Sequence, residues 1–377
     1  MLDQFSITRR RFVKTTCVAS GAVLAGPSAM AAEDKSIPLA LLGVAHMHTP
    51  MYLQILGTRE DVKVKCVWDR DPARATKVAE ACGARVARSA AAAVADADVV
   101  GVVILSETSL HAELAALAAK ARKHVFIEKP IGAGGKDAAE IAAAVEKAGI
   151  LFTTGYHLRT IPKYIFVKQL IGSGAFGKIV RLECSFSNDC LLQGVFDKEF
   201  KWTVDPKWGA LGGFADTGTH ALDVLMWLMG DVEAVSADIR TVTNRYAGCD
   251  ETGQAIIRFR NGVTASLSAG WIEPENPLAL LVAGTEGHAA IFNERLYLRT
   301  KKVAGADGAR PWGKLPPGPD HPVLQFVSAI GGSKDLPLVT AREAAARVKV
   351  MEALYQASRR RLWVTIASEM AGGGVSD

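Results

Sequence analysis

Three side chains of this sequence could together move a proton and polarise an oxygen. Lys129 follows Glu128 in the tripeptide E-K-P, at the end of a run predicted to be a strand. Asp216 and His220 lie four residues apart in "GGFADTGTHALDVLMWLMG", a spacing that places them on one helical face. An ammonium group can polarise a hydroxyl or carbonyl oxygen, and an imidazole oriented by a neighbouring carboxylate can take a proton from an alcohol as hydride leaves carbon. Each feature alone fits a structural role equally well: Lys129 paired with Glu128 on the surface, or His220 packed within an amphipathic helix.

A second group of residues surrounds a turn that could hold a dinucleotide. The stretch "GVAHMHTPMY" follows an apolar run, and Gly43 matches the first glycine of the G-x-G-x-x-G fingerprint, with Ala45 at the second position and His48 at the third. Asp69, which ends the next predicted strand, could accept hydrogen bonds from ribose hydroxyls and repel a 2′-phosphate. Arg70 could instead pair with that phosphate. The pattern favours NAD and leaves NADP open.

His46 and His48 also raise the alternative of a metal site in this turn. Two histidines two residues apart need further ligands from elsewhere in the chain, and the sequence shows none at a recognisable spacing. We therefore expect no metal and interpret the turn as a modified phosphate cradle. The predicted cofactor-binding residues are Gly43, Ala45, His46, Met47, His48, Asp69, Arg70, Glu128 and Lys129.

These residues need a parallel sheet to bring them together. After Ile37, strand-like runs alternate with helical patterns, which predicts an α/β Rossmann domain with a doubly wound parallel sheet over residues 32–155. Strands are expected at 37–44, 62–69, 98–105, 124–130 and 150–156, and helices at 51–58, 72–82, 111–121 and 136–148.

The remainder of the chain, residues 156–377, predicts an α+β domain with a large open, mostly antiparallel sheet. After a helix at 162–171, apolar residues recur at every second position between short turn signals. The expected strands are 178–187, 234–243, 254–260, 263–271, 278–284, 289–293 and 295–300. Residues 304–322 indicate a surface loop, and 340–361 a helix that could pack back on the first domain. Because one final helical segment leaves a broad sheet face uncovered, we expect a homo-oligomer, a dimer or a tetramer.

The first 31 residues indicate a targeting segment. "TRRRFVK" fits the twin-arginine export pattern, and Ala29-Met30-Ala31 offers a cleavage site, so we expect a periplasmic protein exported folded by the twin-arginine machinery. Removing this segment lowers the formal net charge from +5 to +2. That balance favours neither a nucleic-acid nor a membrane partner. The five remaining cysteines share no C-x-x-C spacing, and a Cys184–Cys190 disulfide stays open.

Taken together, the degenerate cradle with Asp69, the E-K-P strand end and the G-G-F-x-D-x-G-x-H-x-x-D stretch resemble the Gfo/Idh/MocA (glucose-fructose oxidoreductase and inositol dehydrogenase) family. The similarity extends through "GYHLRTIPKYIFVKQLIGSGAFGKIV" and "PLVTAREAAARVKVMEALYQAS". It implies a Rossmann domain followed by an open-sheet domain, and oxidation or reduction of sugars and polyols with NAD or NADP. It also implies that Lys129, Asp216 and His220 are catalytic. The departures are Ala45 and His48, where the family more often has glycine or alanine.

The expected function is therefore hydride transfer between a tightly held nicotinamide cofactor and a sugar or polyol. Two alternatives remain: an NAD-dependent glycosidase or lyase that oxidises the sugar transiently, and a non-catalytic nucleotide- or sugar-binding protein. We expect the second domain and the loop 188–211 to set specificity. The predicted substrate-binding residues are His157, Arg159, Asn188, Trp202, Trp208, Asp216 and His220.

Overall fold

A six-stranded parallel sheet forms the first part of the chain in the computed structural model, which describes residues 36–209 and 211–367. The strand order β3-β2-β1-β4-β5-β6 is that of a doubly wound dinucleotide-binding sheet, as predicted. The strands are β1 (Ile37–Leu42), β2 (Val62–Trp68), β3 (Arg85–Val86), β4 (Gly101–Ile104), β5 (His124–Ile127) and β6 (Phe152–Thr154). The predicted export segment lies outside the described residues.

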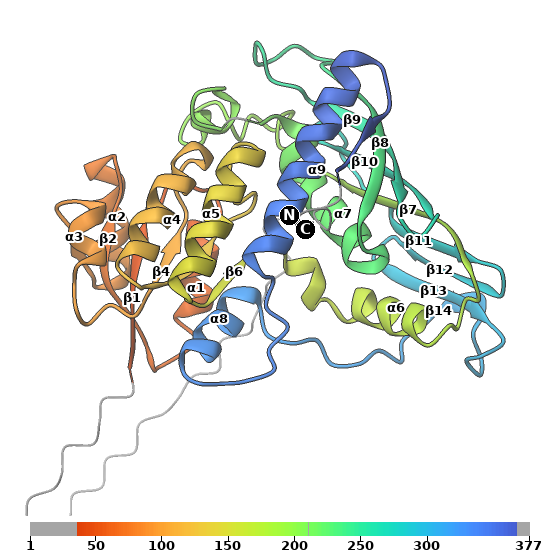
Figure 1. Ribbon diagram of the computed structural model, residues 1–377, viewed down its shortest axis with the longest axis horizontal. Coiled ribbons are helices and arrows are strands. Elements are labelled where there is room, and N and C mark those ends of the chain that lie inside the picture. The colour runs from red at the N-terminus through yellow and green to blue at the C-terminus, as the bar shows by residue number, and fades with distance from the viewer. Residues whose placement is uncertain (1–35, 210, 368–377) are drawn as a thin grey trace, which may run out of the picture. The chain divides into compact units, whose positions relative to one another are not determined.

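Helices cover both faces of this sheet (Figure 1). One core packs α3, α4 and α5 against it, and another packs α1 and α2. Helix α2 shows how the sequence sets these boundaries: the Asp71 side chain accepts the Ala73 N–H, Pro72 opens the helix, and Gly83 ends it with a left-handed φ of 67°. The helices are α1 (Thr49–Leu56), α2 (Pro72–Cys82), α3 (Ala90–Val94), α4 (His111–Lys120), α5 (Gly135–Ala148) and the 3-10 turn η1 (Thr108–Leu110).

A nine-stranded sheet forms the second part, in the order β14-β13-β12-β11-β7-β10-β9-β8-β15. Only β7 and β10 pair in parallel, so the sheet is mixed but mostly antiparallel, as predicted. The strands are β7 (Ile179–Ser187), β8 (Val232–Arg240), β9 (Thr252–Phe259), β10 (Thr264–Gly270), β11 (Leu278–Gly284), β12 (Gly287–Phe292), β13 (Arg295–Thr300), β14 (Asp307–Pro311) and β15 (Val364–Thr365).

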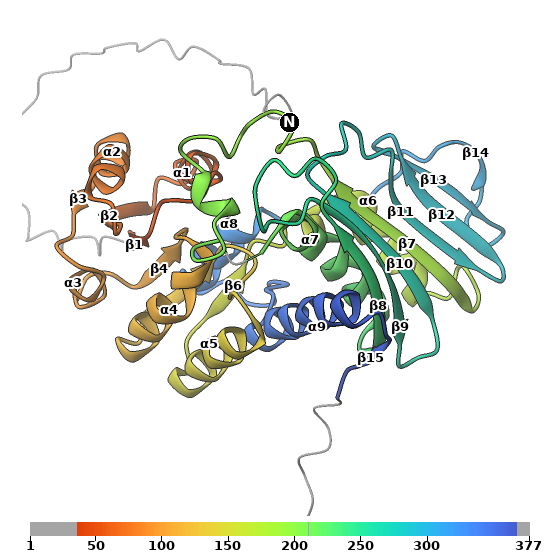
Figure 2. The same cartoon turned by 90° about the horizontal axis from the view of Figure 1, so that it is seen from above.

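The helices of this part gather on one face of the large sheet (Figure 2). Helix α7 (Gly213–Met229) packs on β7 and β10, α9 (Ala341–Arg360) packs on β8, and α6 (Pro162–Gly172) joins the same core. Along β9, buried and exposed residues alternate, which is the pattern of a sheet with one covered face. Helix α7 is buried over most of its length, so side chains near its start are held rigidly.

Helix α9 belongs to both cores. Its residues Ala344 and Val348 pack with the first sheet's core, whereas Val350 and Met351 pack with the second. Figure 1 shows α9 between α5 and the large sheet, and α9 contacts α5 and β8.

The structure contains short elements that the sequence analysis did not predict, and it answers the question that the disulfide left open. The first sheet has a sixth strand, β3, because a two-residue strand leaves no periodic pattern. The stretch 304–322 contains β14 at the sheet edge and so is not only a loop. A second helix, α8 (Pro322–Ile330), precedes α9 and packs on the first sheet. Cys184 and Cys190 are free thiols, like the other cysteines of the described residues, so the optional disulfide is absent from this structure.

Within residues 36–209 and 211–367, no helix combines the length and the apolar character that crossing a membrane requires.

A buried ion cluster ties three elements together. Asp223 of α7 is 1% exposed and accepts hydrogen bonds from Arg159 at 2.9 and 2.6 Å and from Arg347 of α9 at 3.0 Å. Arg159 lies in the 3-10 turn η2 (His157–Thr160) and also bonds Glu343. The guanidinium of Arg159 thus bonds α7 and α9 in this structure, and its predicted substrate role stays a prediction.

We expect Asp223→Ala to lower the free energy of unfolding by about 3–5 kcal/mol, because it removes the carboxylate partner of the buried Arg347 and leaves Arg159 with Glu343 alone. Urea denaturation followed by circular dichroism measures this loss. The matched control is Asp238→Ala, which removes an exposed ion pair with Arg240 and should cost no more than about 1 kcal/mol. Equal losses in the two variants would contradict the structural role of Asp223.

Candidate active site

The turn after β1 allows a close approach that only glycine permits. Gly43 has a left-handed φ of 77°, and a Cβ placed on it would overlap the side chain and backbone of Ser106, which follows β4. Beyond the turn, His48 precedes α1 without a side-chain cap, and Pro50 lies at the helix start. An uncapped helix start beside a glycine turn suits an anionic group such as a pyrophosphate.

Asp69 ends β2 as predicted, but its carboxylate points into the protein. Oδ2 accepts the backbone N–H of Val44 at 2.7 Å, and Oδ1 accepts the Asp71 N–H and the Arg74 guanidinium. Asp69 therefore ties the glycine turn to the start of α2. Its predicted contact with a ribose stays a prediction.

The loop 188–211 lies against this cofactor half of the site. The Trp202 indole donates to the Ala45 carbonyl oxygen at 3.1 Å, and the Arg70 guanidinium stacks on Trp208 at 3.8 Å. The Trp208 carbonyl in turn accepts the Ser109 N–H at 3.1 Å. Both tryptophans thus contact predicted cofactor-binding elements in this structure, where we had expected substrate contacts.

Lys129 and Asp216 form a buried ion pair that joins the first sheet to α7. The Lys129 Nζ lies 2.8 Å from Asp216 Oδ1, and Lys129 is 3% exposed. Burial lowers the pKa of Lys129, but Asp216 and Glu128 outweigh that effect and raise it. Burial opposes ionisation of Asp216 too, yet the Lys129 charge holds the pKa of that carboxyl below its usual value.

This pairing corrects the expected partner of Asp216. Residues 216 and 220 share a helix face, but Asp216 Oδ1 turns to Lys129, and Oδ2 accepts the Trp271 indole N–H at 3.0 Å. Asp216 therefore controls the charge of Lys129 rather than the orientation of His220.

His220 is a buried imidazole with an open hydrogen-bonding position. Burial, the Lys129 charge and His157 together depress its pKa well below 6.5, so the ring is neutral near pH 7. It lies 4.9 Å from the ring of His157 and 4.7 Å from that of Phe186. Its Nδ1 is buried and has no hydrogen-bond partner among the described residues, which is typical of a group that meets a ligand.

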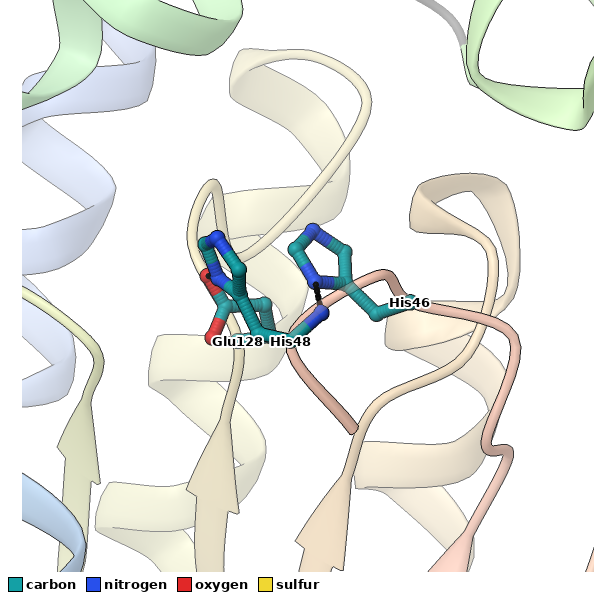
Figure 3. Close-up of side chains that lie close together, drawn as sticks. All are labelled: His46, His48 and Glu128. Carbon is teal, nitrogen blue, oxygen red and sulfur yellow. Dashed lines mark hydrogen bonds and ion pairs between the residues drawn. The ribbon is translucent and has the colours of Figure 1, made fainter. Parts of the chain in front are cut away.

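Glu128, which precedes Lys129 in the chain, lies close to the two turn histidines, His46 and His48 (Figure 3). Candidate ligand atoms of His46, His48 and Glu128 all lie within 4.8 Å of one another, which would suit a cation. The His46 Nδ1, however, accepts the His48 backbone N–H at 3.2 Å, so a neutral His46 carries its proton on Nε2 and cannot ligate a metal there. Tyr52 donates to the second oxygen of Glu128. We keep the prediction that this turn serves the cofactor.

The structure thus brings together Lys129, Asp216, His220 and His157, with Glu128, His46 and His48 beside them. The Asn188 side chain accepts the Cys190 N–H in a local turn, and its predicted substrate contact stays a prediction. Sequence reasoning missed Glu107, Tyr52 and Trp271. Only Glu107 left a usable signal, because it follows a parallel strand at the edge where such sheets bind ligands.

Two family models match the chain. Residues 37–156 match "Oxidoreductase family, NAD-binding Rossmann fold", and residues 164–290 match "GFO/IDH/MocA C-terminal domain".

Two curated relatives are dehydrogenases. Levoglucosan dehydrogenase of Pseudarthrobacter phenanthrenivorans is 26% identical over 253 residues, which cover 60% of this chain and 64% of that protein. The scyllo-inositol 2-dehydrogenase (NAD(+)) of Bacillus subtilis is 25% identical, over 73% of this chain and 79% of that protein. The chain therefore spans slightly less than two thirds of the first relative and somewhat more of the second.

Among solved structures, the WlbA dehydrogenase from Bordetella pertussis, in complex with NADH and UDP-GlcNAcA, aligns with a TM-score of 0.78. The alignment covers 89% of this chain and 100% of that one at 22% identity, so it shows a shared fold.

We expect Asp216→Asn to lower the pKa of Lys129, because burial lowers it and the carboxylate that raises it is gone. Lys129 should then lose its proton at a lower pH than in the wild type. Lysine side-chain NMR, assigned with Lys129→Arg, measures the shift. Asp205→Asn, whose side chain bonds only a local N–H, serves as control. An unchanged or higher pKa in Asp216→Asn would refute the pairing.

Proposed function

Because the chain belongs to the Gfo/Idh/MocA oxidoreductase family, we propose that it transfers a hydride between a tightly bound nicotinamide nucleotide and a hydroxyl or carbonyl carbon of a sugar or polyol. The observation that carries this proposal is the buried Lys129–Asp216 pair beside the neutral His220. The two dehydrogenase relatives support the substrate class.

The residues around the turn fit a nicotinamide dinucleotide. Gly43 leaves room where any side chain would collide with Ser106, and buried polar atoms of Glu107, Ser109 and His220 lack partners within the described chain. When bound, the nucleotide supplies the hydride acceptor. Its phosphates would lie against the turn 43–48, and Lys129 would lie near the reacting carbon.

In the proposed oxidation, Lys129 and His220 divide two tasks. The Lys129 ammonium, kept charged by Asp216, donates a hydrogen bond to the substrate oxygen and stabilises negative charge on it. The neutral His220 takes the hydroxyl proton while the C–H electron pair leaves as hydride, so the alcohol becomes a carbonyl. The rings of Phe186 and Tyr156 lie beside His220 and limit water around it.

One observation favours redox-assisted cleavage as a second candidate function. The His48 Nδ1 lies 3.5 Å from Glu128, which leaves its other nitrogen available as a base besides His220. A glycosidase or lyase that oxidises a sugar transiently needs such a second base, to remove a proton next to the new carbonyl.

We extend the proposal to location and assembly. The twin-arginine pattern supports export of a folded protein to the periplasm, with the cofactor loaded beforehand and retained. Val180 and Ile256 are 57% and 47% exposed on the large sheet, which supports a homo-oligomer formed through its bare face.

We expect Lys129→Ala and His220→Ala each to slow sugar oxidation by about 10²-fold or more while the bound nucleotide stays in place. The near-ultraviolet absorbance of the reduced nicotinamide, after mixing with sugars and polyols, measures the rate. His288→Gln, on β12, is the matched histidine control and should match wild type. Full activity of either alanine variant would show that the site is elsewhere. Release of a free sugar from a glycoside without net nicotinamide reduction would favour the second candidate.

We also expect the purified protein to carry nicotinamide nucleotide, because an exported enzyme meets no free supply. Denaturing it and identifying the released nucleotide by mass spectrometry tests this. If the purified protein carried no nucleotide and bound neither NAD nor NADP, the proposed enzymatic function would be refuted.

The proposed export is tested separately. The periplasmic fraction should contain a chain beginning near Ala32, and Arg9→Lys/Arg10→Lys should keep the protein in the cytoplasm.

A further inference from the structure

Glu107 is a buried carboxylate that the proposed reaction does not use. It follows β4, is 0% exposed, and accepts hydrogen bonds through Oε1 from Arg70 and Arg74, both at 2.7 Å. Its second oxygen, Oε2, is buried and lacks a hydrogen-bond partner among the described residues. A charged acceptor left unsatisfied in the interior is costly, so it marks a position where a ligand supplies a donor.

A second unpartnered group lies two residues further along. The Ser109 hydroxyl is buried without a partner within the described chain, although its backbone N–H bonds the Trp208 carbonyl. Glu107 and Ser109 are both linked to Trp208, Glu107 through Arg70 and Ser109 through its own N–H, and we call these two residues the polar patch. Because Arg70 and Arg74 follow β2, the strand whose end meets the adenosine ribose in this type of sheet, the patch lies on the adenosine side of the cofactor site.

The charges on this side are already balanced. Arg74 bonds both Asp69 and Glu107, and Arg70 bonds Glu107 while its flat face stacks on Trp208. Two guanidinium groups therefore face two carboxylates, and their positive charges do not exceed the negative ones. A phosphate, which brings a charge of about −1.5 to −2, would meet both carboxylates in a poorly solvated place.

We infer that Glu107 determines cofactor choice: Oε2 accepts a hydrogen bond from the 2′-hydroxyl of the adenosine ribose, and its charge, with that of Asp69, excludes the 2′-phosphate of NADP. The inference rests on the proposed function, which supplies a nicotinamide nucleotide. On this inference, Arg70 neutralises the charge of Glu107 and does not bind the phosphate.

Binding of NAD⁺ and NADP⁺ to nucleotide-free protein, measured by calorimetry, tests this without using the reaction. Wild type should bind NAD⁺ at least about 100-fold more tightly than NADP⁺. Glu107→Gln should reduce that preference at least about tenfold, chiefly through tighter NADP⁺ binding, because Arg70 and Arg74 then outnumber the carboxylates. Removing the 2′-hydroxyl of NAD⁺ should weaken its binding to the wild type more than its binding to Glu107→Gln, since a neutral amide makes a weaker hydrogen bond.

Two variants complete the experiment. Glu199→Gln removes an exposed carboxylate paired with Lys77 and should keep the wild-type preference. Arg70→Ala leaves the two carboxylates with one cation, so it should weaken NADP⁺ binding at least as much as NAD⁺ binding, and it keeps the test valid if Glu107→Gln does not fold.

Three results would overturn the inference. They are NADP⁺ binding as tight as NAD⁺ in wild type, an unchanged preference in folded Glu107→Gln, and a preference that shifts toward NADP⁺ in Arg70→Ala. Binding of neither nucleotide to wild type would overturn the proposed function as well, which separates the two failures.

Discussion

The buried ion pair between Lys129 and Asp216 is the interaction on which the site depends. Lys129 extends from the edge of the first sheet, and Asp216 comes from the first turn of α7, so the pair forms only when both parts of the chain have packed. Burial alone would remove the charge of either partner, and each keeps the other ionised. The 2.8 Å contact thereby fixes a cation where the strands end, and the charge of Lys129 helps to keep His220 neutral.

The polar residues around this pair form two groups, one of neutral side chains and one of paired charges. On the substrate side, imidazoles dominate: His157 and His220 pack against one another, and burial lowers the pKa of His157 to about 4. Neutral rings can accept a proton, and they add no positive charge beside Lys129 until they do. On the adenosine side, guanidinium groups and carboxylates cancel in pairs around Glu107. One edge of a sheet thus provides a proton-transfer region and a charge-balanced region.

The sequence predicted the elements wherever the physical signal was local. Helix α2 matches its prediction because Asp71, Pro72 and Gly83 define its ends through short-range geometry. The partner of Asp216 could not be predicted in this way. Helical spacing places two residues on one face, but the direction of a carboxylate depends on what the rest of the chain brings to it, here Lys129 and Trp271. The position of Glu107 after a parallel strand was a signal in the sequence, but its partners could not be predicted, since only the structure shows Arg70 and Arg74 converging on it.

Helix α9 has a consequence for synthesis of the chain. Because Ala344 and Val348 complete the core of the first sheet, that core stays unfinished until almost the entire polypeptide has left the ribosome. During most of translation the first sheet therefore lacks part of its core, because the residues that complete this core lie nearly 200 positions beyond β6.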